Sequence, residues 1–508
     1  MKTIALALWS LGSLASLWSP APVHAAESPA TLRAGFAYAD ITPDLGMEQP
    51  GGYGKSFHRT FHDACKVRAA VFDDGRKVAA VIGLDLLAIP RSVVLDARAQ
   101  IKKATGIKPE VVLLNASHSH SSGPIGMVQP GEYDTADETV RRLAYEESSL
   151  ADKGFLLHLA RQIALAVKNA HAARAPVQLG YGFGHEDKVA FNRRLRMKNG
   201  QSWSHPGAGN PDILGYAAPI DPQVGVIAAW DARGQLAGVL VNYACHATTN
   251  PGGISANWPY YLERTIQGAL QAAVPVVFLQ GTSGDVTQVD NLSPHPRPGA
   301  EEWAQQVGGR VGAEAVKTIL LMPRSAQATV DFKATTLSIP RRAPADTTLA
   351  KARALLAAGK PRGESSEWMF AKETLMLDHL IRVSPRVEVE VQAIQVGPTV
   401  FVSSPAEYFV EYGLRIKKES PFAFTFPCSL SNGCVGYVPT EEAFGPNGGG
   451  YETRLTSYSN LEITAGTQIA DTGIALAKSL KPDPAPARPI VPYSGRPWAY
   501  GNVPPGLR

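Results

Sequence analysis

The feature that most constrains the fold of this chain is a recurring strand–turn–strand pattern. Apolar runs lie on both sides of the tetrapeptides Asp-Asp-Gly-Arg and Asp-Ala-Arg-Gly and of the dipeptide Gly-Pro. Turn residues between apolar runs indicate β-hairpins, and hairpins make at least part of a sheet antiparallel. The three predicted hairpins join residues 66–72 to 77–87, residues 224–230 to 236–243, and residues 387–396 to 400–402.

Amphipathic helices and short apolar strands alternate with these hairpins. Residues 155–167 and 303–319 each keep apolar side chains on one helical face. Residues 111–115 and 274–279 are short apolar runs typical of buried strands. The combination predicts an α/β fold with a mixed, partly antiparallel sheet and helices.

Two local patterns refine this expectation. Asp346 is the expected N-cap, and Gly359 the expected C-terminal stop, of a helix over residues 347–358. Residues 180–184, with the sequence Gly-Tyr-Gly-Phe-Gly, predict a glycine-rich turn. Because no long helix follows this segment, it does not indicate a dinucleotide-binding site.

Composition excludes several classes of protein. The 508 residues are 44% hydrophobic and 19% charged, which is too apolar and too weakly charged for a disordered chain. A formal net charge of +4 over this length gives no electrostatic footprint for nucleic acid. Four cysteines are too few for a disulfide-built scaffold. Cys428 and Cys434 are nevertheless spaced closely enough to form a disulfide in an exported protein.

The two ends of the chain differ from its body. Residues 1–25 combine a basic start, an apolar middle and small residues, the parts of a signal peptide cleaved after Ala25. No other stretch approaches the roughly 18 uninterrupted apolar residues of a membrane span. Residues 481–508 are rich in proline and predict an extended tail without a core of its own. We therefore expect an exported protein, periplasmic or secreted.

The segment after residues 111–115 is the most informative for chemistry. It reads Ala-Ser-His-Ser-His and contains His118 and His120. If the chain stays extended there, both imidazoles project to the same side, because side chains alternate along a strand. Two imidazoles placed in this way can bind one metal ion, or one can bind a metal while the other meets substrate. A polar loop with two solvated histidines is the alternative.

Further candidates also follow apolar strands. His246 comes directly after Cys245, which we expect to be a small buried hydrophobe. Asp285 ends the run Gly-Thr-Ser-Gly-Asp, which predicts a tight turn. Such a turn can hold an oxyanion or position a nucleophile. The alternative is an ordinary turn with an Asp cap. Glu407 follows the third predicted hairpin. Two histidines and a glutamate with an open position are a ligand set suited to hydrolytic zinc.

In chain order, these motifs resemble those of the neutral/alkaline non-lysosomal ceramidases. The resemblance runs from about residue 33 to about residue 480 and implies one large ceramidase-like catalytic domain over residues 26–480. The matching motifs are Ala-Asp-Ile-Thr-Pro at 39–43, Gly-Tyr-Gly at 52–54, His118-Ser-His120, His246, Gly284-Asp285, Pro405-Ala-Glu407, and Tyr437 with Glu-Glu downstream.

The resemblance implies a zinc amidase that cleaves the N-acyl bond of a sphingolipid. Its implied metal ligands are His118, His246, Glu407 and Tyr437. In the implied mechanism His120 and Tyr451 face the substrate carbonyl and His120 or Asp285 moves a proton. Arg193 belongs to the catalytic set through its Asn-Arg-Arg segment, and Asp85 lines the substrate pocket.

Two departures from the family pattern affect mechanism and substrate. The family has Gly-Asp-Val-Ser-Pro, whose Ser has been proposed as the nucleophile, whereas this chain has Thr287 followed by Gln. The extra methyl group and the missing Pro change the turn, so we favour a metal-activated water as the attacking group. A proline-rich tail stands where the family has an immunoglobulin-like domain. We therefore expect this chain to share the family's reaction chemistry more closely than its ceramide substrate.

Two other functions remain open. The same site suits a zinc esterase or deacetylase acting on a small or carbohydrate-linked acyl group, because esters and amides share a tetrahedral intermediate. The second alternative is a catalytically inactive binding module of the same fold. The expected partner is a lipid or other N-acyl small molecule, with peripheral membrane contact and without nucleic acid.

Overall fold

The structure is a computed structural model that describes residues 32–361, 363, 365–488, 490–495, 498, 500 and 504–507. The predicted signal peptide, residues 1–25, lies outside these residues. Within the described part of the chain, no helix has the length and the apolar character needed to cross a membrane.

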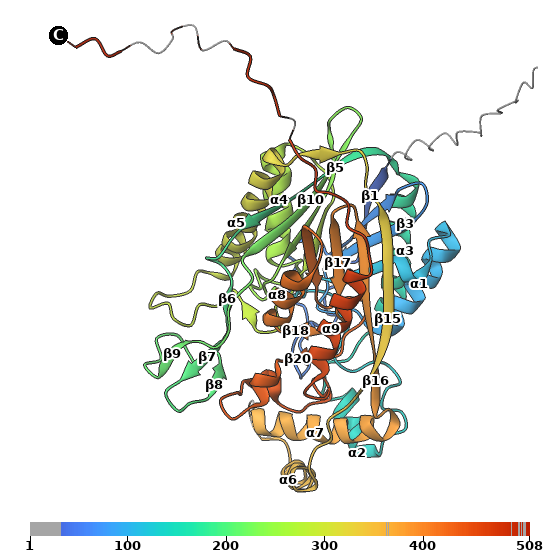
Figure 1. The fold of residues 1–508 in the computed structure, drawn as a ribbon. Coiled ribbons are helices and arrows are strands. Elements are labelled where there is room, and N and C mark those ends of the chain that lie inside the picture. The colour runs from blue at the N-terminus through green and yellow to red at the C-terminus, as the bar shows by residue number, and fades with distance from the viewer. Residues whose placement is uncertain are drawn as a thin grey trace, which may run out of the picture.

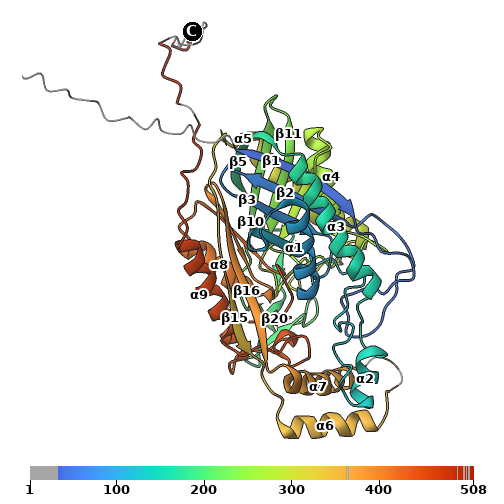
Figure 2. The same ribbon diagram turned by 90° about the vertical axis from the view of Figure 1, so that its right-hand side faces the viewer.

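The largest sheet has nine strands in the order β12-β11-β10-β5-β1-β2-β3-β4, with β14 paired to β5. Helices α1 and α3 lie on one side of these strands, and α4 and α5 lie on the other (Figures 1 and 2). The strands are β1 (Arg33–Asp40), β2 (Lys66–Asp73), β3 (Val78–Leu84), β4 (Val112–Ala116), β5 (Ala175–His185), β10 (Gln223–Asp231), β11 (Leu236–Tyr243), β12 (Val276–Gln280) and β14 (Arg324–Ser325). The helices are α1 (Arg91–Thr105), α3 (Lys153–Ala172), α4 (Trp258–Leu270) and α5 (Ala300–Leu321).

Strand pairing follows the predicted pattern. The first two predicted hairpins are the antiparallel pairs β2–β3 and β10–β11, and the two short apolar runs are β4 and β12. These last two strands run parallel to β3 and β11, so the sheet is mixed. The prediction of an α/β fold with a partly antiparallel sheet is therefore confirmed.

The alternation of side chains along β10 shows how the core is built. Val224 and Val226 pack in an apolar cluster with α4 and α5. Ile227 and Ala229 point the other way, into a cluster shared with β1 to β4. Because both faces of β10 are buried, its sequence is apolar throughout rather than alternately polar.

A second sheet lies beside the first, in the order β15-β16-β17-β19. Its pair β16–β17 is the third predicted hairpin, and β17 runs parallel to β19. Helices α8 and α9 pack on it (Figure 1). The elements are β15 (Val330–Pro340), β16 (Arg386–Val396), β17 (Thr399–Ser403), β19 (Phe424–Cys428), α8 (Val410–Glu419) and α9 (Ala465–Lys478).

Short strand pairs connect the larger elements. β6 pairs with β13, β18 pairs with β20, and β7 pairs with both β8 and β9. Their bounds are β6 (Phe191–Asn192), β7 (Arg194–Met197), β8 (Ser202–Ser204), β9 (Ile213–Tyr216), β13 (Val286–Thr287), β18 (Glu407–Tyr408) and β20 (Tyr437–Val438). The short 3-10 helices are η1 (Pro109–Val111), η2 (Glu441–Phe444) and η3 (Tyr451–Thr453).

Helices α2 (Glu138–Tyr145), α6 (Asp346–Ala357) and α7 (Ser366–Val383) form a group at one end of the molecule, at the bottom of Figure 1. Helix α6 corresponds to the helix predicted over residues 347–358. Asp346 is its first residue rather than its N-cap, which is Ala345. Gly359 follows the helix with φ of +90°, as expected of a C-terminal stop.

The prediction of a turn at residues 180–184 is wrong, because this segment lies inside β5. Its glycines allow α5 to pack closely on the strand. A Cβ added at Gly182 would lie 2.6 Å from Cγ2 of Thr318, and one at Gly184 would lie 2.9 Å from Cβ of Glu314. The absence of side chains here is a packing requirement rather than a turn signal.

The start of the proline-rich tail lies along the second sheet. The Gln395 side chain donates a hydrogen bond to the carbonyl oxygen of Lys481 at 2.7 Å, and the backbone N–H of Thr329 donates to Asp483 at 2.6 Å. The four cysteines all lie in the described part of the chain and are free thiols. The disulfide considered between Cys428 and Cys434 is therefore not formed.

Candidate metal centre

His118 and His120 lie just beyond the carboxyl end of β4, where the chain turns. His118 has a φ of +66°, so the segment is not extended as the alternation of side chains assumed. The two rings still meet, with centroids 4.8 Å apart and Nε2 atoms 3.3 Å apart. A left-handed conformation costs a non-glycine residue about 1–3 kcal/mol. The surrounding fold therefore holds His118 against its local preference.

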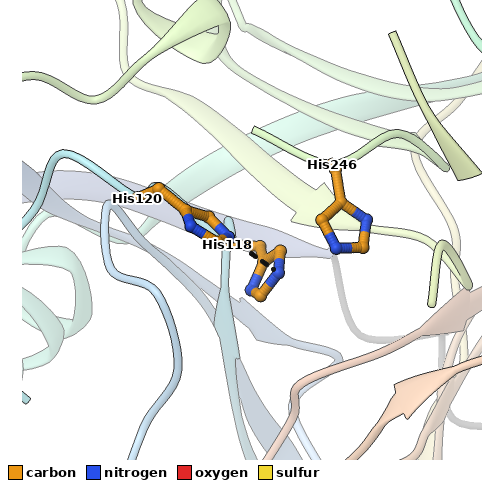
Figure 3. Close-up of side chains that lie close together, drawn as sticks. All are labelled: His118, His120 and His246. Carbon is orange, nitrogen blue, oxygen red and sulfur yellow. Dashed lines mark hydrogen bonds between the residues drawn. The ribbon is translucent and has the colours of Figure 1, made fainter. Parts of the chain in front are cut away.

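His246 and Glu407 reach the same place from other strands. His246 follows β11, and its backbone N–H donates to the carbonyl oxygen of Val286 at 3.1 Å. Glu407 is the first residue of β18, whose parallel pairing with β20 sets it opposite Tyr437. Figure 3 shows His118 between His120 and His246, and the candidate ligand atoms of these three residues lie within 4.8 Å of one another.

Two imidazoles converge on one carboxylate oxygen. Oε2 of Glu407 lies 3.0 Å from Nε2 of His118 and 3.1 Å from Nε2 of His246. The Nδ1 atom of His118 donates to the carbonyl oxygen of Leu87 at 2.8 Å. The Nδ1 atom of His246 donates to the carbonyl oxygen of Ser283 at 2.7 Å. Since a carbonyl can only accept, Nδ1 carries the proton and Nε2 keeps a lone pair. Metal-ligating histidines are held in this way.

Electrostatics favour the neutral forms of His246 and His120. Burial, together with the charge of Arg193, lowers the pKa of His246 to about 3. Burial and the neighbouring imidazoles hold the pKa of His120 well below its usual value. Neutral imidazole and ionised carboxylate are the forms that bind metal ions.

This donor set fits a metal ion. Oε2 of Glu407 is buried, and among the described residues it accepts no hydrogen bond. A buried carboxylate oxygen without a donor is costly, and a bound cation would remove that cost. The imidazole and carboxylate ligands match those of hydrolytic zinc sites.

Arg193 lies against the same centre. Its Nη1 atom donates to Nε2 of His246 at 3.2 Å, and its Nε atom donates to Oε1 of Glu452 at 2.7 Å. Its guanidinium lies 5.3 Å from the ring centroid of Tyr437 and 5.0 Å from that of Tyr451. A buried positive charge therefore faces both the histidine cluster and the two tyrosines.

Tyr437 and Tyr451 form a pair of hydroxyl groups beside Arg193. Their oxygen atoms lie 2.8 Å apart. Burial raises the pKa of both hydroxyls above their usual value, so both remain protonated donors at neutral pH. Tyr437 is held by β20, and Tyr451 is the first residue of η3. The structure thus brings together His118, His120, His246, Glu407, Arg193, Tyr437 and Tyr451.

The Asp285 carboxylate is occupied by structural contacts. It accepts a hydrogen bond from Nδ2 of Asn192 at 2.6 Å and another from the backbone N–H of Val410 at 2.9 Å. Its carbonyl oxygen accepts from the backbone N–H of Arg193 at 2.8 Å. Asp285 therefore connects the segment that carries Arg193 to the start of α8.

Thr287 and Asp85 also bond to residues outside the histidine cluster. The Thr287 hydroxyl donates to Oε1 of Gln288 at 3.0 Å. Asp85 lies 2.8 Å from Nη1 of Arg68, and Arg68 also pairs with Glu263 at 2.6 Å. Asp85 is thus part of a buried ion-pair network between β2 and α4.

Two residues of the centre carry no sequence signal that could have identified them. Glu452 is buried and pairs with Arg193, yet a lone glutamate after Tyr451 gives no sign of burial. Tyr458 donates its hydroxyl proton to Oε1 of Glu407 at 2.9 Å. No spacing or motif links Tyr458 to Glu407, because the contact is made by tertiary structure.

Sequence comparison gives one informative relative. No protein-family model matches the chain. A curated protein, the neutral ceramidase of Pseudomonas aeruginosa, is 29% identical over 314 residues. The aligned region is 58% of this chain and 42% of that protein. The match therefore covers less than half of the relative's length.

Two solved structures share the fold over nearly the whole chain. One, described as a ceramidase complexed with C2, has a TM-score of 0.64 at 20% identity. The other, neutral ceramidase from Pseudomonas aeruginosa, has a TM-score of 0.62 at 18% identity. Each likeness covers 91% of this chain and 77% of the other. The chain therefore has the fold of the neutral ceramidases, as its ordered motifs predict.

Proposed function

We propose that this chain is an exported, zinc-dependent hydrolase that cleaves an N-acyl amide bond, as a ceramidase does. One observation carries the proposal. Nε2 of His118 and Nε2 of His246 both lie about 3 Å from the same oxygen of Glu407, at 3.0 and 3.1 Å. A buried, converging set of this kind is the chemistry of hydrolytic zinc. The ceramidase likeness supports the class of reaction.

His118, His246 and Glu407 would hold the zinc ion, with Tyr437 as a fourth ligand. Such an ion polarises a carbonyl group and lowers the pKa of water towards neutrality. The backbone carbonyls that accept from each Nδ1 leave both Nε2 atoms without a proton, as a metal ligand requires.

His120 is the group that we assign to proton transfer. Its Nε2 atom lies 3.3 Å from that of His118, and the ring is neutral because its pKa is lowered. His120 takes the proton released when water adds to the amide carbon. It returns this proton to the nitrogen as the C–N bond breaks, so the products are a carboxylic acid and an amine.

Tyr451 and Arg193 would stabilise the charge that develops on the carbonyl oxygen. The Tyr451 hydroxyl is a protonated donor, and the guanidinium of Arg193 lies 5.0 Å from the Tyr451 ring centroid. Donors and charges that are held in place before the reaction stabilise an oxyanion without reorganisation. The ion pair with Glu452 keeps Arg193 in this position.

The contacts of Thr287 favour attack by water over a covalent route. A hydroxyl nucleophile needs an adjacent base to take its proton. The Thr287 hydroxyl instead donates to Oε1 of Gln288 at 3.0 Å. Asp285, bonded to Asn192 and Val410, is better suited to position Arg193 than to relay a proton.

A substrate panel tests the proposal. Purified protein is assayed with N-acyl sphingosines of short and long chain, the matching O-acyl esters and an acetylated sugar. The assays are run before chelation, after chelation, and after zinc is restored. We expect release of fatty acid from the amides, loss of activity on chelation and recovery with zinc. Cleavage of esters or sugar acetates alone would indicate an esterase or deacetylase. Zinc binding without turnover would indicate a binding module.

Export is part of the proposal and has its own test. The chain is expressed with its N-terminus intact, and the protein found outside the cytoplasm is analysed by intact mass. Cleavage after Ala25 is the expected result. Retention of residues 1–25 on an otherwise active protein would contradict it.

A further inference from the structure

The two oxygens of the Glu407 carboxylate have different surroundings. Oε2 faces Nε2 of His118 and Nε2 of His246 and accepts no hydrogen bond within the described part of the chain. Oε1 accepts the hydroxyl proton of Tyr458 at 2.9 Å. Since the carboxylate is planar, a donor fixed on Oε1 also fixes the direction of Oε2.

Tyr458 is in turn held by a third polar group. Its oxygen lies 3.3 Å from Sγ of Cys434. A phenol has one proton, and that of Tyr458 is directed at Glu407, so the Cys434 thiol donates to the Tyr458 oxygen. The hydrogen bonds therefore run in one direction, from Cys434 through Tyr458 to Glu407.

The turn that carries Tyr458 is tied to the strand beside Glu407. The Ser459 hydroxyl accepts from the backbone N–H of Tyr437 at 3.0 Å, and Tyr437 lies opposite Glu407 in the β18–β20 pair. The ring of Tyr458 packs edge-on against that of Tyr437, with centroids 6.1 Å apart. These contacts keep the Tyr458 hydroxyl in register with the carboxylate.

We propose that Tyr458 is a positioning residue, whose hydroxyl fixes the Glu407 carboxylate so that Oε2 alone is presented to the metal ion. The inference rests on the metal site of the proposed function. Partners that orient a metal ligand typically contribute 10- to 100-fold in metal affinity, roughly, when they are removed. Tyr458→Phe keeps the ring and removes only the donor.

Zinc affinity is the test. Metal-free wild-type protein and Tyr458→Phe are titrated with zinc in competition with a chromophoric chelator. Tyr412→Phe is the matched control, since it removes a buried tyrosine hydroxyl that bonds to the carbonyl oxygen of Pro439. We expect Tyr458→Phe to bind zinc roughly 10- to 100-fold more weakly. Tyr412→Phe should bind like the wild type.

A double-mutant cycle separates positioning from a general structural effect. Glu407→Gln weakens zinc binding itself, so in that background the added Tyr458→Phe change should have little further effect. If Tyr458 acted through overall stability, the two losses would instead add. Thermal unfolding of the metal-free forms gives a second readout, and Tyr458→Phe and Tyr412→Phe should unfold at similar temperatures.

The outcomes distinguish this inference from the proposed function. Failure of the wild type to bind zinc would overturn the metal site and the role of Tyr458 together. Tight zinc binding by both the wild type and Tyr458→Phe would overturn the role of Tyr458 and leave the metal site intact. Additive losses in the cycle would also overturn it.

Discussion

Gly51 approaches the ring of His120 so closely that a methyl group at Gly51 would overlap it. A Cβ added there would lie 2.3 Å from Nδ1 of His120, and Gly51 has a φ of +108° that disfavours other residues. The same loop is tied to this histidine by the Gln49 side chain, which donates to the carbonyl oxygen of His120 at 3.0 Å. The loop therefore determines where the His120 ring lies.

Gly51→Ala should displace His120 and leave the metal ligands in place. A displacement of about 1 Å at a reacting group can cost roughly 100-fold in rate, so we expect kcat/KM to fall by about that factor. Zinc content should stay at the wild-type level, because the three atoms nearest to the added Cβ all belong to His120, which is not one of the proposed ligands. Steady-state kinetics and metal analysis on the same preparation check both expectations.

Gly52→Ala is the matched control for that variant. A Cβ added at Gly52 would lie 3.8 Å from the nearest other atom, the carbonyl oxygen of Gly54, which is an ordinary van der Waals distance. We expect kcat/KM close to the wild-type value. Equal losses in the two variants would show that the loop, and not the contact with His120, is responsible.

Removing either candidate histidine ligand should remove the metal. His118→Ala and His246→Ala each take away an Nε2 atom that lies about 3 Å from Oε2 of Glu407, at 3.0 and 3.1 Å. We expect purified variants to carry little zinc by elemental analysis. His185→Ala, at an exposed position, should retain it. A full complement of zinc in both His118→Ala and His246→Ala would refute the assignment.

Much of the fold could be predicted because its signals are local. The hairpins β2–β3 and β10–β11 follow from turn residues between apolar runs, and α3 and α5 follow from helical periodicity. Residues 180–184 misled for a non-local reason. Glycines are needed there because the side chains of α5, a helix far away in the sequence, pack against this strand and leave no room for a Cβ.

The candidate site could be predicted where motifs mark it and not where tertiary contacts complete it. His118 and His246 each follow the end of a strand, and the structure brings them to Glu407. The prediction that the His118 and His120 rings lie close together is correct, but it assumed an extended segment. The φ of His118 is +66°, so the segment is not extended. Tyr458 bonds to Glu407 through the fold alone, so nothing in the sequence around it indicated the contact.

Thr287→Ala tests the covalent route. The Thr287 hydroxyl donates to Gln288, so we expect turnover within a few-fold of the wild type. Loss of a true nucleophile lowers kcat by roughly 10⁴-fold or more. A fall of that size, with zinc retained, would make Thr287 the attacking group and reject the water route.

Burial of Cys428 predicts a loss of stability in alkaline solution. Burial raises the pKa of its thiol in the folded state above the unfolded value of about 8.5. Above that pH the unfolded chain loses the proton and the folded chain keeps it, so the free energy of unfolding falls. The loss approaches about 1.4 kcal/mol per pH unit for one such thiol.

Cys428→Ala should reduce the slope of this loss. Urea unfolding between about pH 9 and pH 10.5 measures the slope, since one thiol contributes up to about 1.4 kcal/mol per pH unit. Ser429→Ala, a neighbouring buried residue that does not titrate, serves as the control and should keep the wild-type slope. Identical slopes in all three proteins would mean that Cys428 does not contribute.

The ion pair between Arg193 and Glu452 should be far more important for stability than its surface counterpart between Arg196 and Glu442. Both pairs have N–O distances of 2.7 Å, but the Glu452 side chain is 0% exposed and that of Glu442 is 47% exposed. Glu452→Gln removes the direct ion-pair partner of the buried Arg193, and loss of one partner of a buried pair typically costs about 3–5 kcal/mol. Glu442→Gln should cost less than about 1 kcal/mol, because water already screens that pair.

Urea unfolding of the metal-free proteins gives both values without a contribution from bound zinc. Similar losses in the two variants would show that burial does not set the strength of the Arg193 pair, and the rigid placement of Arg193 beside Tyr451 would then need another cause.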